Sequence, residues 1–342
     1  MPTVRIVFAP DSFKGSITAS DAAAAMAEGW ASVRPDDDLV LLPQADGGEG
    51  TLEAMAAAIP DAVRRSVGDV TGPDGRPVPG EWLELPDGTA VVELAQSSGI
   101  ALMSALDPLG ATTRGLGEVI AAALRSGASG LVIGLGGSAS TDGGAGALGA
   151  LTGIEPPPLG VTLLTDVIAP LLGPTGAAAV FGPQKGATPA DIAFLEGRLT
   201  DWAGGFDADP NTPGAGAAGG TAYGFLAAWN ATIEPGSTAI ATLTKLPEHL
   251  RTADVLITGE GSFDETSYTG KVVGHAMQLA QDAGVARTIA IAGRFTTEPH
   301  LLDGRLVASI SISVLAGSPE AALADPTRWL ISAGQQAANS LN

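Results

Sequence analysis

A run of small and polar residues, GGSASTDGGAG at 136–146, follows an apolar segment at 131–135. Glycines allow a backbone to approach a ligand closely, and the start of the helix expected next adds free amides and a positive dipole end. An anion is therefore the natural occupant of this turn. The groups predicted to bind it are the amides of Gly136, Gly137 and Ser138, together with the Ser138 hydroxyl.

The segment APDSFKGS at 9–16 carries charged side chains after the first apolar segment. In a parallel α/β sheet, ligands gather at the carboxyl ends of the strands. Asp11, Ser12 and Lys14 are therefore expected at a ligand-binding crevice.

The segment PQADGGEGT at 43–51 repeats this arrangement with two acids, Asp46 and Glu49. Two carboxylates on a strand-end loop suit a Mg²⁺ site or a base for a hydroxyl group. An acidic surface turn has the same composition, so both interpretations stay open.

Two further segments add lysines and acids. FGPQKGAT at 181–188 places Lys185 before a helix expected to begin at Pro189, and a lysine there is a phosphate clamp, a carboxylate partner or a solvated side chain. The segment LITGEGSFDETSYTGK at 256–271 follows a buried strand, which favours a site over a surface loop. Its candidate residues are Glu260, Asp264, Thr266 and Lys271.

The glycine-rich segments do not fit the common nucleotide fingerprints. No Lys-Ser/Thr pair follows the glycines after residue 136, as a Walker P-loop requires. A dinucleotide fingerprint at 134–139 lacks the acid that should end a second strand, because Glu155 lies in a proline-rich connector. A nicotinamide-dependent oxidoreductase is kept as the alternative from a different functional class.

Composition excludes several partners. The chain has 37 acidic and 17 basic residues, a net charge of −20, which repels nucleic acid and anionic membranes. It has no cysteine, and its three histidines, His249, His275 and His300, have no metal-ligand spacing. No cationic leader precedes a long apolar run, and no run reaches the roughly 20 residues of a membrane span. A cytoplasmic protein is expected.

Apolar strand-like segments alternate with alanine-rich helical segments along the chain, which predicts an α/β fold with a largely parallel sheet. Strands are predicted at 4–9, 40–42, 90–94, 131–135, 161–165, 255–258, 288–292 and 307–312. Helices are predicted at 21–33, 51–58, 117–125, 189–202, 220–229 and 272–283.

At 342 residues the chain is long enough for two domains. The alternation breaks between residues 66 and 94, where hairpin signals appear without a helix. A second crossing is expected near 233–237. The prediction is a discontinuous domain of residues 1–66 and 237–342, with residues 67–236 inserted.

Six segments occur in the order typical of the type I glycerate kinase family, which the chain resembles over nearly its whole length. They are IVFAPDSFKGS, PQADGGEGT, GLGGSASTDGGAG, VFGPQKGAT, PGAGAAGG and DVLITGEG. The resemblance implies a glycerate 2-kinase that phosphorylates D-glycerate with ATP and Mg²⁺, typically to 2-phosphoglycerate. It also implies a Rossmann/flavodoxin-like parallel-sheet domain with a second α/β domain inserted in it, and an active site in the cleft. The oligomeric state stays open, a homo-oligomer included.

Phosphoryl transfer needs donors for the phosphates, a metal held by carboxylates and an acceptor for the hydroxyl proton. With the resemblance, Lys14 and Lys185 are assigned to the substrate carboxylate or the transferring phosphoryl group. Asp46 or Asp142 is assigned as the proton acceptor or metal holder, with Glu49 as a second metal ligand. The other assigned positions are Asp11, Ser12 and Gly136–Ser138 for substrate or phosphate, and Glu260, Asp264, Thr266 and Lys271 for the nucleotide.

The chain departs from the family pattern at four places. The connector at 151–161 is shorter than usual, and Leu116, Ala169 and Ser262 stand where the family usually has threonine, asparagine and arginine. Loss of a cation and of a polar side chain near a phosphate site would weaken binding or shift the substrate. A kinase of another small hydroxy acid and a weakened paralogue with a binding role are therefore kept as alternatives.

Overall fold

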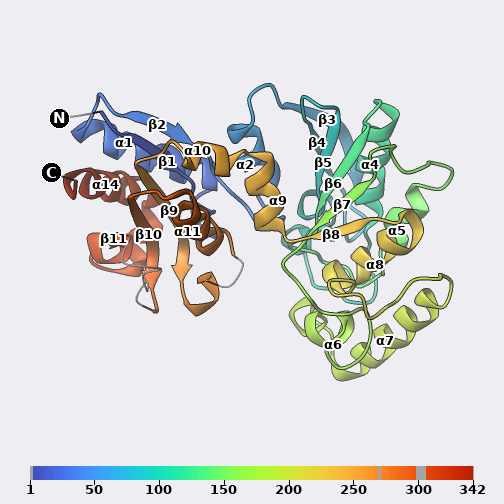
Figure 1. Cartoon of the computed structure of the whole chain (residues 1–342). Helices are drawn as coiled ribbons and strands as arrows, with labels where there is room; N and C mark the ends of the chain where they lie inside the picture. Colours follow the sequence, from blue (N-terminus) through green and yellow to red (C-terminus); the bar gives the residue numbers. More distant parts are fainter. Residues whose placement is uncertain (1–2, 269–270, 298–305, 342) are drawn as a thin grey trace. The chain divides into compact units, whose positions relative to one another are not determined.

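The structure, a computed structural model, describes residues 3–268, 271–297 and 306–341. The chain divides into two compact units, each with its own sheet (Figure 1). The first unit consists of residues 1–45, 53–60 and 237–342, and the second of residues 46–52 and 61–236. Both units are mixed α/β, which confirms the predicted fold class.

The first unit is built on a five-stranded parallel sheet in the order β11-β10-β9-β1-β2. Its strands are β1 (Arg5–Phe8), β2 (Asp38–Leu41), β9 (Val255–Phe263), β10 (Arg287–Phe295) and β11 (Leu306–Ser311). The chain leaves β1 toward β2 on one side and leaves β9 toward β10 on the other. The strand order therefore reverses between the neighbours β1 and β9.

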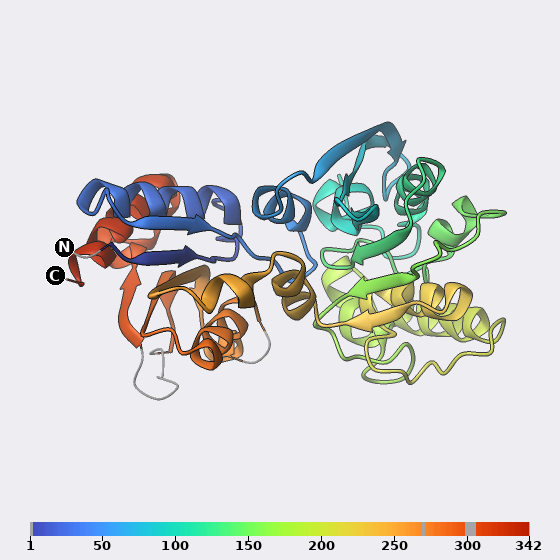
Figure 2. The ribbon, with the colours of Figure 1, turned by 45° about the horizontal axis from the view of Figure 1, so that its top comes forward.

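Helices cover both faces of this sheet. They are α1 (Ala19–Val33), α2 (Thr51–Ala58), α9 (Gly236–Leu243), α10 (Leu246–Leu250), α11 (Val272–Ala283), α12 (Ile312–Ala316), α13 (Pro319–Ala324) and α14 (Pro326–Asn339). The ribbon shows helices on both sides of this sheet (Figure 2). Ile6 and Phe8 of β1 pack with α1 and α14, whereas Val7 packs with α10 and α11 on the opposite face, as the period of two in a strand requires. The loops that follow β1 and β9 therefore lead to opposite faces.

Two glycines allow α1 and α14 to pack closely. A Cβ on Gly29 would clash with the carbonyl oxygen of Ile331, and one on Gly334 with that of Met26. We expect Gly29→Ala to lower the free energy of unfolding by about 1–3 kcal/mol, because backbone atoms cannot yield as a flexible side chain can. Urea unfolding measures this effect. Gly197→Ala, at a helical glycine with open space around it, is the matched control and should be neutral or stabilising; equal effects would contradict the proposed close contact.

The second unit has a six-stranded sheet in the order β3-β4-β5-β6-β7-β8. Its strands are β3 (Val63–Thr71), β4 (Pro77–Glu84), β5 (Thr89–Glu93), β6 (Gly130–Gly134), β7 (Val161–Leu164) and β8 (Thr232–Glu234). β3, β4 and β5 pair antiparallel, as the hairpin signals predict, and the pairs from β5 to β8 are parallel. The predicted boundary at residue 66 falls within β3, which lies wholly in this unit. The assignment of residues 1–66 and 237–342 to one domain, with residues 67–236 as an inserted domain, stays a prediction.

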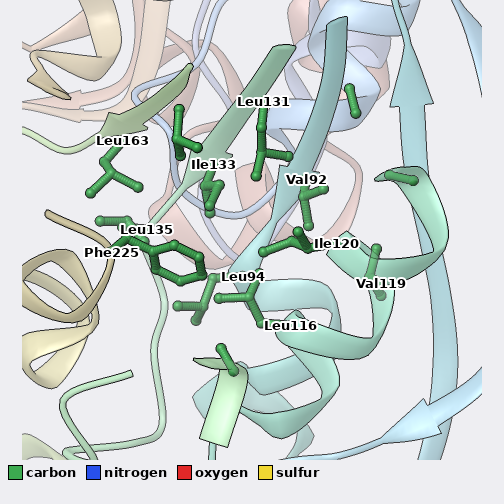
Figure 3. Close-up of a cluster of buried hydrophobic side chains, with 14 of the residues drawn as sticks. Val92, Leu94, Leu116, Val119, Ile120, Leu131, Ile133, Leu135, Leu163 and Phe225 are labelled. Carbon is green, nitrogen blue, oxygen red and sulfur yellow. The ribbon is translucent and has the colours of Figure 1, made fainter. Parts of the chain in front are cut away.

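The core of the second unit lies between this sheet and its helices (Figure 3). The helices are α3 (Leu94–Ser98), α4 (Arg114–Arg125), α5 (Ala145–Ala150), α6 (Ala177–Phe181), α7 (Pro189–Ala203) and α8 (Ala217–Trp229). Ile133 and Leu163 of the sheet pack with Ile120 of α4 and Phe225 of α8, and all four are fully buried. This core fixes the carboxyl ends of β5 and β6, from which the polar loops of the unit begin.

Among the described residues, no helix combines the length and the apolar content needed to cross a membrane. His249 and His275 are half-buried on α10 and α11, and His300 lies outside the described residues.

Candidate active site

The loop that follows β1 is fixed against β9 in the first unit. The Asp11 amide donates to the carbonyl oxygen of Gly259 at 2.8 Å. A Cβ on Gly261 would lie 3.2 Å from the backbone nitrogen of Lys14. Lys14 is exposed, and Asp11 and Ser12 are half-buried. This loop lies at the carboxyl ends of β1 and β9, the neighbouring strands between which the strand order reverses. Open α/β sheets bind ligands at such a position.

Glu260 belongs to the same edge, but on β9 itself rather than on the loop that the sequence suggested, because β9 continues to Phe263. The side chain is 9% exposed and its Oε1 has no hydrogen-bond partner among the described residues. Burial raises the pKa of Glu260, while a hydrogen bond with Ser267 and the charge of Lys271 lower it. A buried carboxylate with an unused oxygen is available to a ligand at this edge.

Asp264 and Thr266 interact with each other at the start of the 3₁₀ helix Glu265–Tyr268. Asp264 Oδ1 accepts from the Thr266 amide at 2.8 Å and from its hydroxyl at 2.6 Å, which lowers the pKa of Asp264. These bonds shape the turn. Lys271 is exposed at the N-cap of α11, while residues 269 and 270 lie outside the described residues.

Arg294 is a residue that the sequence analysis missed. It lies opposite Ser262 in the β9–β10 register, and its Nε donates to Ser262 Oγ at 3.1 Å. Within the described part of the chain, it forms no ion pair with an acid. A guanidinium from β10 therefore lies beside the position where the family pattern usually has an arginine.

In the second unit, the loop that carries Asp46 packs on the loop that follows β6. The Gly136 amide donates to Gly47 O at 3.0 Å, and a Cβ on Gly136 would clash with the Cα of Gly48. The exposed Asp46 accepts from the Gly48 amide at 2.9 Å. The structure thus brings together two loops separated by some ninety residues of sequence, although the first follows β2 and the second follows β6, which belong to different sheets.

Glu93, at the end of β5, anchors the Asp46 loop and was not predicted from the sequence. Its two carboxylate oxygens accept from the amides of Gly50 and Leu52, each at 3.1 Å, and the side chain is 3% exposed. Burial raises the pKa of Glu93 to about 7, against the bonds from Leu52 and Gly50 that lower it, and the charge of Glu49 raises it further.

This pKa predicts a pH-dependent stability. A carboxyl with pKa near 7 in the folded chain and 4.5 when unfolded binds its proton more tightly when folded, so stability falls as the pH rises from 4.5 to 7. The fall is about 3 kcal/mol at about 1.36 kcal/mol per pKa unit. Glu93→Gln should remove this component, as measured by urea unfolding at pH 5 and pH 7.5. The exposed Glu155→Gln is the control, and an unchanged pH dependence in Glu93→Gln would refute the assignment.

Lys185 lies in the 3₁₀ helix Pro183–Lys185 and is 3% exposed. Its ammonium donates to the carbonyl oxygen of Ser140. Burial lowers the pKa of Lys185 to about 8, and the charge of Asp142 acts in the opposite direction. A cavity of about 120 Å³ lies beside it, lined also by Gly136, Gly137 and Ser138. The structure therefore brings Lys185 together with the predicted anion-binding turn.

Asp142 has a different environment from Asp46. Its carboxylate accepts from the amide and hydroxyl of Thr113 at 2.9 and 2.8 Å, and from the amides of Gly144 and Gly146 at 3.0 and 3.3 Å. These bonds join the starts of α4 and α5. The Asp142 carboxylate therefore stabilises this loop, and its negative charge favours the charged form of Lys185.

The whole chain matches one family model, described as the glycerate kinase family, over residues 6–157 and 155–342. This chain belongs to the glycerate kinase family. It is therefore an ATP-dependent kinase, as the resemblance implied.

Relatives of the kinase are similar over most of their length. The glycerate 2-kinase of Escherichia coli is 38% identical over 345 residues, covering 86% of this chain and 90% of that protein. The glycerate kinase of Bacillus subtilis is 38% identical over 334 residues, covering 87% of each. A crystal structure from Salmonella typhimurium LT2, described as a candidate glycerate kinase 2, is similar with a TM-score of 0.83 at 33% identity, covering 99% of this chain and 98% of that one.

The fold of the kinase explains Leu116 and is compatible with Ala169. Leu116 is fully buried in the core of the second unit, so its side chain packs there. Ala169 contributes its carbonyl oxygen, which accepts from the Gly216 amide at 2.9 Å, and this bond does not depend on the side chain.

The carboxylates of this chain suit a Mg²⁺ ion that is also bound by the phosphates of a substrate. The described part of the chain contains no cluster of three or more metal-ligating side chains. Mg²⁺ commonly uses one or two carboxylates with waters and substrate phosphates, and Asp46 and Glu49 are two exposed carboxylates on one loop.

Proposed function

We propose that this kinase transfers the terminal phosphoryl group of Mg²⁺-ATP to the 2-hydroxyl of D-glycerate, giving 2-phosphoglycerate. The family match supports a glycerate kinase, and a relative named glycerate 2-kinase supports the 2-position. The observation that carries the proposal is the cavity beside Lys185, which combines a buried cation with a glycine-rich turn in a space suited to a small acid.

The residues fall into two proposed roles. In the first unit, Glu260, Lys271 and Arg294 bind the nucleotide at the edge where the strand order reverses, with Asp264 and Thr266 shaping the adjoining turn. Lys14 contacts the transferring phosphoryl group, with Asp11 and Ser12 beside it. A lysine there stabilises negative charge that develops during transfer.

In the second unit, Lys185 and the turn at Gly136–Ser138 bind the acid substrate. Asp46 accepts the proton of the attacking hydroxyl, because it is exposed and, within the described residues, accepts a hydrogen bond from only one amide, that of Gly48. Glu49 would hold Mg²⁺, which neutralises phosphate charge when bound, and Asp46 would be its second ligand in the alternative in which Asp46 does not take the proton. Asp142 positions the loop instead of taking the proton.

A coupled assay of ADP release tests this function, with D-glycerate, L-glycerate and a blank without acid compared in the presence of Mg²⁺ and of excess EDTA. The expected result is stereoselective, Mg²⁺-dependent turnover with D-glycerate, and phosphorus NMR of the product should show 2-phosphoglycerate. Turnover with a different small hydroxy acid would replace the substrate.

A further inference from the structure

Backbone amides line the cavity of the second unit without an acceptor. Gly137, Ser138, Ala218 and Gly219 all line it, and within the described residues none of their four N–H groups has a hydrogen-bond partner. Gly219 is buried and Ser138 and Ala218 are half-buried, whereas Gly137 is exposed. Buried backbone N–H groups are nearly always paired in folded proteins, so unpaired donors at this cavity favour an anionic ligand.

The turn at the start of α8 has an unusual conformation that presents two of these amides. Ala218, Gly219 and Gly220 are all left-handed, with φ values of 52°, 64° and 86°. Left-handed backbone is unfavourable for an L-alanine. A change from right-handed to left-handed residues, as between Gly216 and Ala218, forms concave amide surfaces that bind anions. A regular helix would have pointed these amides along its axis.

This turn is fixed to the loop that follows β6. The Gly143 amide donates to Gly219 O at 3.0 Å, and a Cβ on Gly219 would lie 2.6 Å from the Cα of Thr141. The same loop receives the ammonium of Lys185 at Ser140 O. The cation and the two pairs of amides therefore hold a fixed arrangement.

Charge and size decide which anion fits. Lys185 is the one charged side chain among the described residues that line the cavity, and Leu135, Val167 and Phe181 supply apolar surface. A single cation matches a singly charged group better than a phosphate with two or more charges. The cavity volume of about 120 Å³ suits a small acid.

We propose that this cavity binds the carboxylate of the acid substrate through Lys185 and the amides of Gly137, Ser138, Ala218 and Gly219. The assignment rests on the proposed function and makes it more specific. The cavity selects hydroxy acids over neutral polyols, and it leaves the phosphoryl group to other residues.

Calorimetric titration of the full chain with D-glycerate and with its neutral amide tests this assignment, with and without ADP and Mg²⁺. We expect D-glycerate to bind at least about tenfold more tightly than the amide, from the strength of hydrogen bonds to charged groups. Lys185→Met should weaken D-glycerate binding by about ten- to a hundredfold and remove this discrimination, with the KM for ATP unchanged. Arg125→Met, which removes an exposed charge from the same unit, is the control and should bind like the wild type.

A second measurement does not depend on the folding of the variant. Burial lowers the pKa of Lys185 to about 8, so the affinity of the wild type for D-glycerate should fall by up to about tenfold per pH unit above that value. Asp142 is the acid that acts on this ammonium, and the nearby Arg198 donates to Thr141 O at 2.8 Å and stays charged throughout.

The outcomes separate this assignment from the proposed function. Unchanged D-glycerate affinity in a folded Lys185→Met variant, or a wild type that binds no small carboxylate at all, would overturn the carboxylate assignment. A wild type that does not phosphorylate D-glycerate, yet binds another small hydroxy acid through Lys185, would overturn the proposed substrate and uphold the carboxylate site.

Discussion

Lys14→Ala is expected to lower kcat by about 10²- to 10³-fold, the loss typical for removal of one group that stabilises developing charge. The loop that carries Lys14 is fixed by its backbone, through the bond from Asp11 to Gly259 and the close approach to Gly261. The exposed side chain of Lys14 makes no hydrogen bond or ion pair within the described residues, so its removal should leave stability unchanged. Steady-state kinetics with saturating ATP and D-glycerate measure the effect.

The control for Lys14→Ala is Lys245→Ala, which removes an exposed positive charge from the same unit. Both variants should unfold at the wild-type temperature, and only Lys14→Ala should lose turnover. Ordinary kcat in Lys14→Ala would remove this lysine from the active site. A parallel loss of kcat and thermal stability would assign it a structural role instead.

Local patterns predicted most of the strands and several helix starts, because these depend on neighbouring residues, but the helices α9 and α14 were not predicted. Thr18 caps α1 through the Asp21 amide at 3.1 Å, as a threonine before a helix predicts. Pro189 begins α7 as predicted, and Thr188 forms a capping box there with Asp191. The hairpin signals around residues 66–94 likewise correspond to the antiparallel strands β3, β4 and β5.

The residues that the sequence analysis missed act through contacts between distant segments. Glu93 follows an ordinary apolar strand, and its function as an anchor appears only because the amides of Gly50 and Leu52 lie against it. Arg294 reaches Ser262 across two parallel strands, over a separation of 32 residues. No local pattern marks either side chain.

The glycine-rich segment before α8 shows a different limit. The sequence placed the helix start at residue 220. The structure has left-handed residues from Ala218 to Gly220. An alanine in that conformation is unfavourable locally, so the surrounding loop contacts, not the local sequence preference, determine it.

Asp46→Asn is expected to lower kcat by about 10²- to 10⁴-fold, the range for loss of a general base, with little change in the KM for D-glycerate. Asparagine keeps a side-chain oxygen that can accept from the Gly48 amide, so the loop should retain its conformation. The substitution removes the charge and the proton acceptor and leaves the shape. Asp142→Asn has the opposite expectation, since it disturbs a carboxylate that accepts from Thr113, Gly144 and Gly146.

The two variants together decide which carboxylate takes the proton. If Asp46 is the base, Asp46→Asn melts like the wild type and loses the ascending limb of its pH–rate profile, whereas Asp142→Asn melts at a lower temperature and keeps that limb. If Asp142→Asn loses the limb and Asp46→Asn keeps it, the roles are exchanged, and the hydrogen bonds of Asp142 would have to rearrange when substrate binds. A metal-holding role for Asp46 predicts a third pattern, in which higher Mg²⁺ concentrations partly restore the activity of Asp46→Asn, because a weakened site can be refilled by mass action and a missing base cannot.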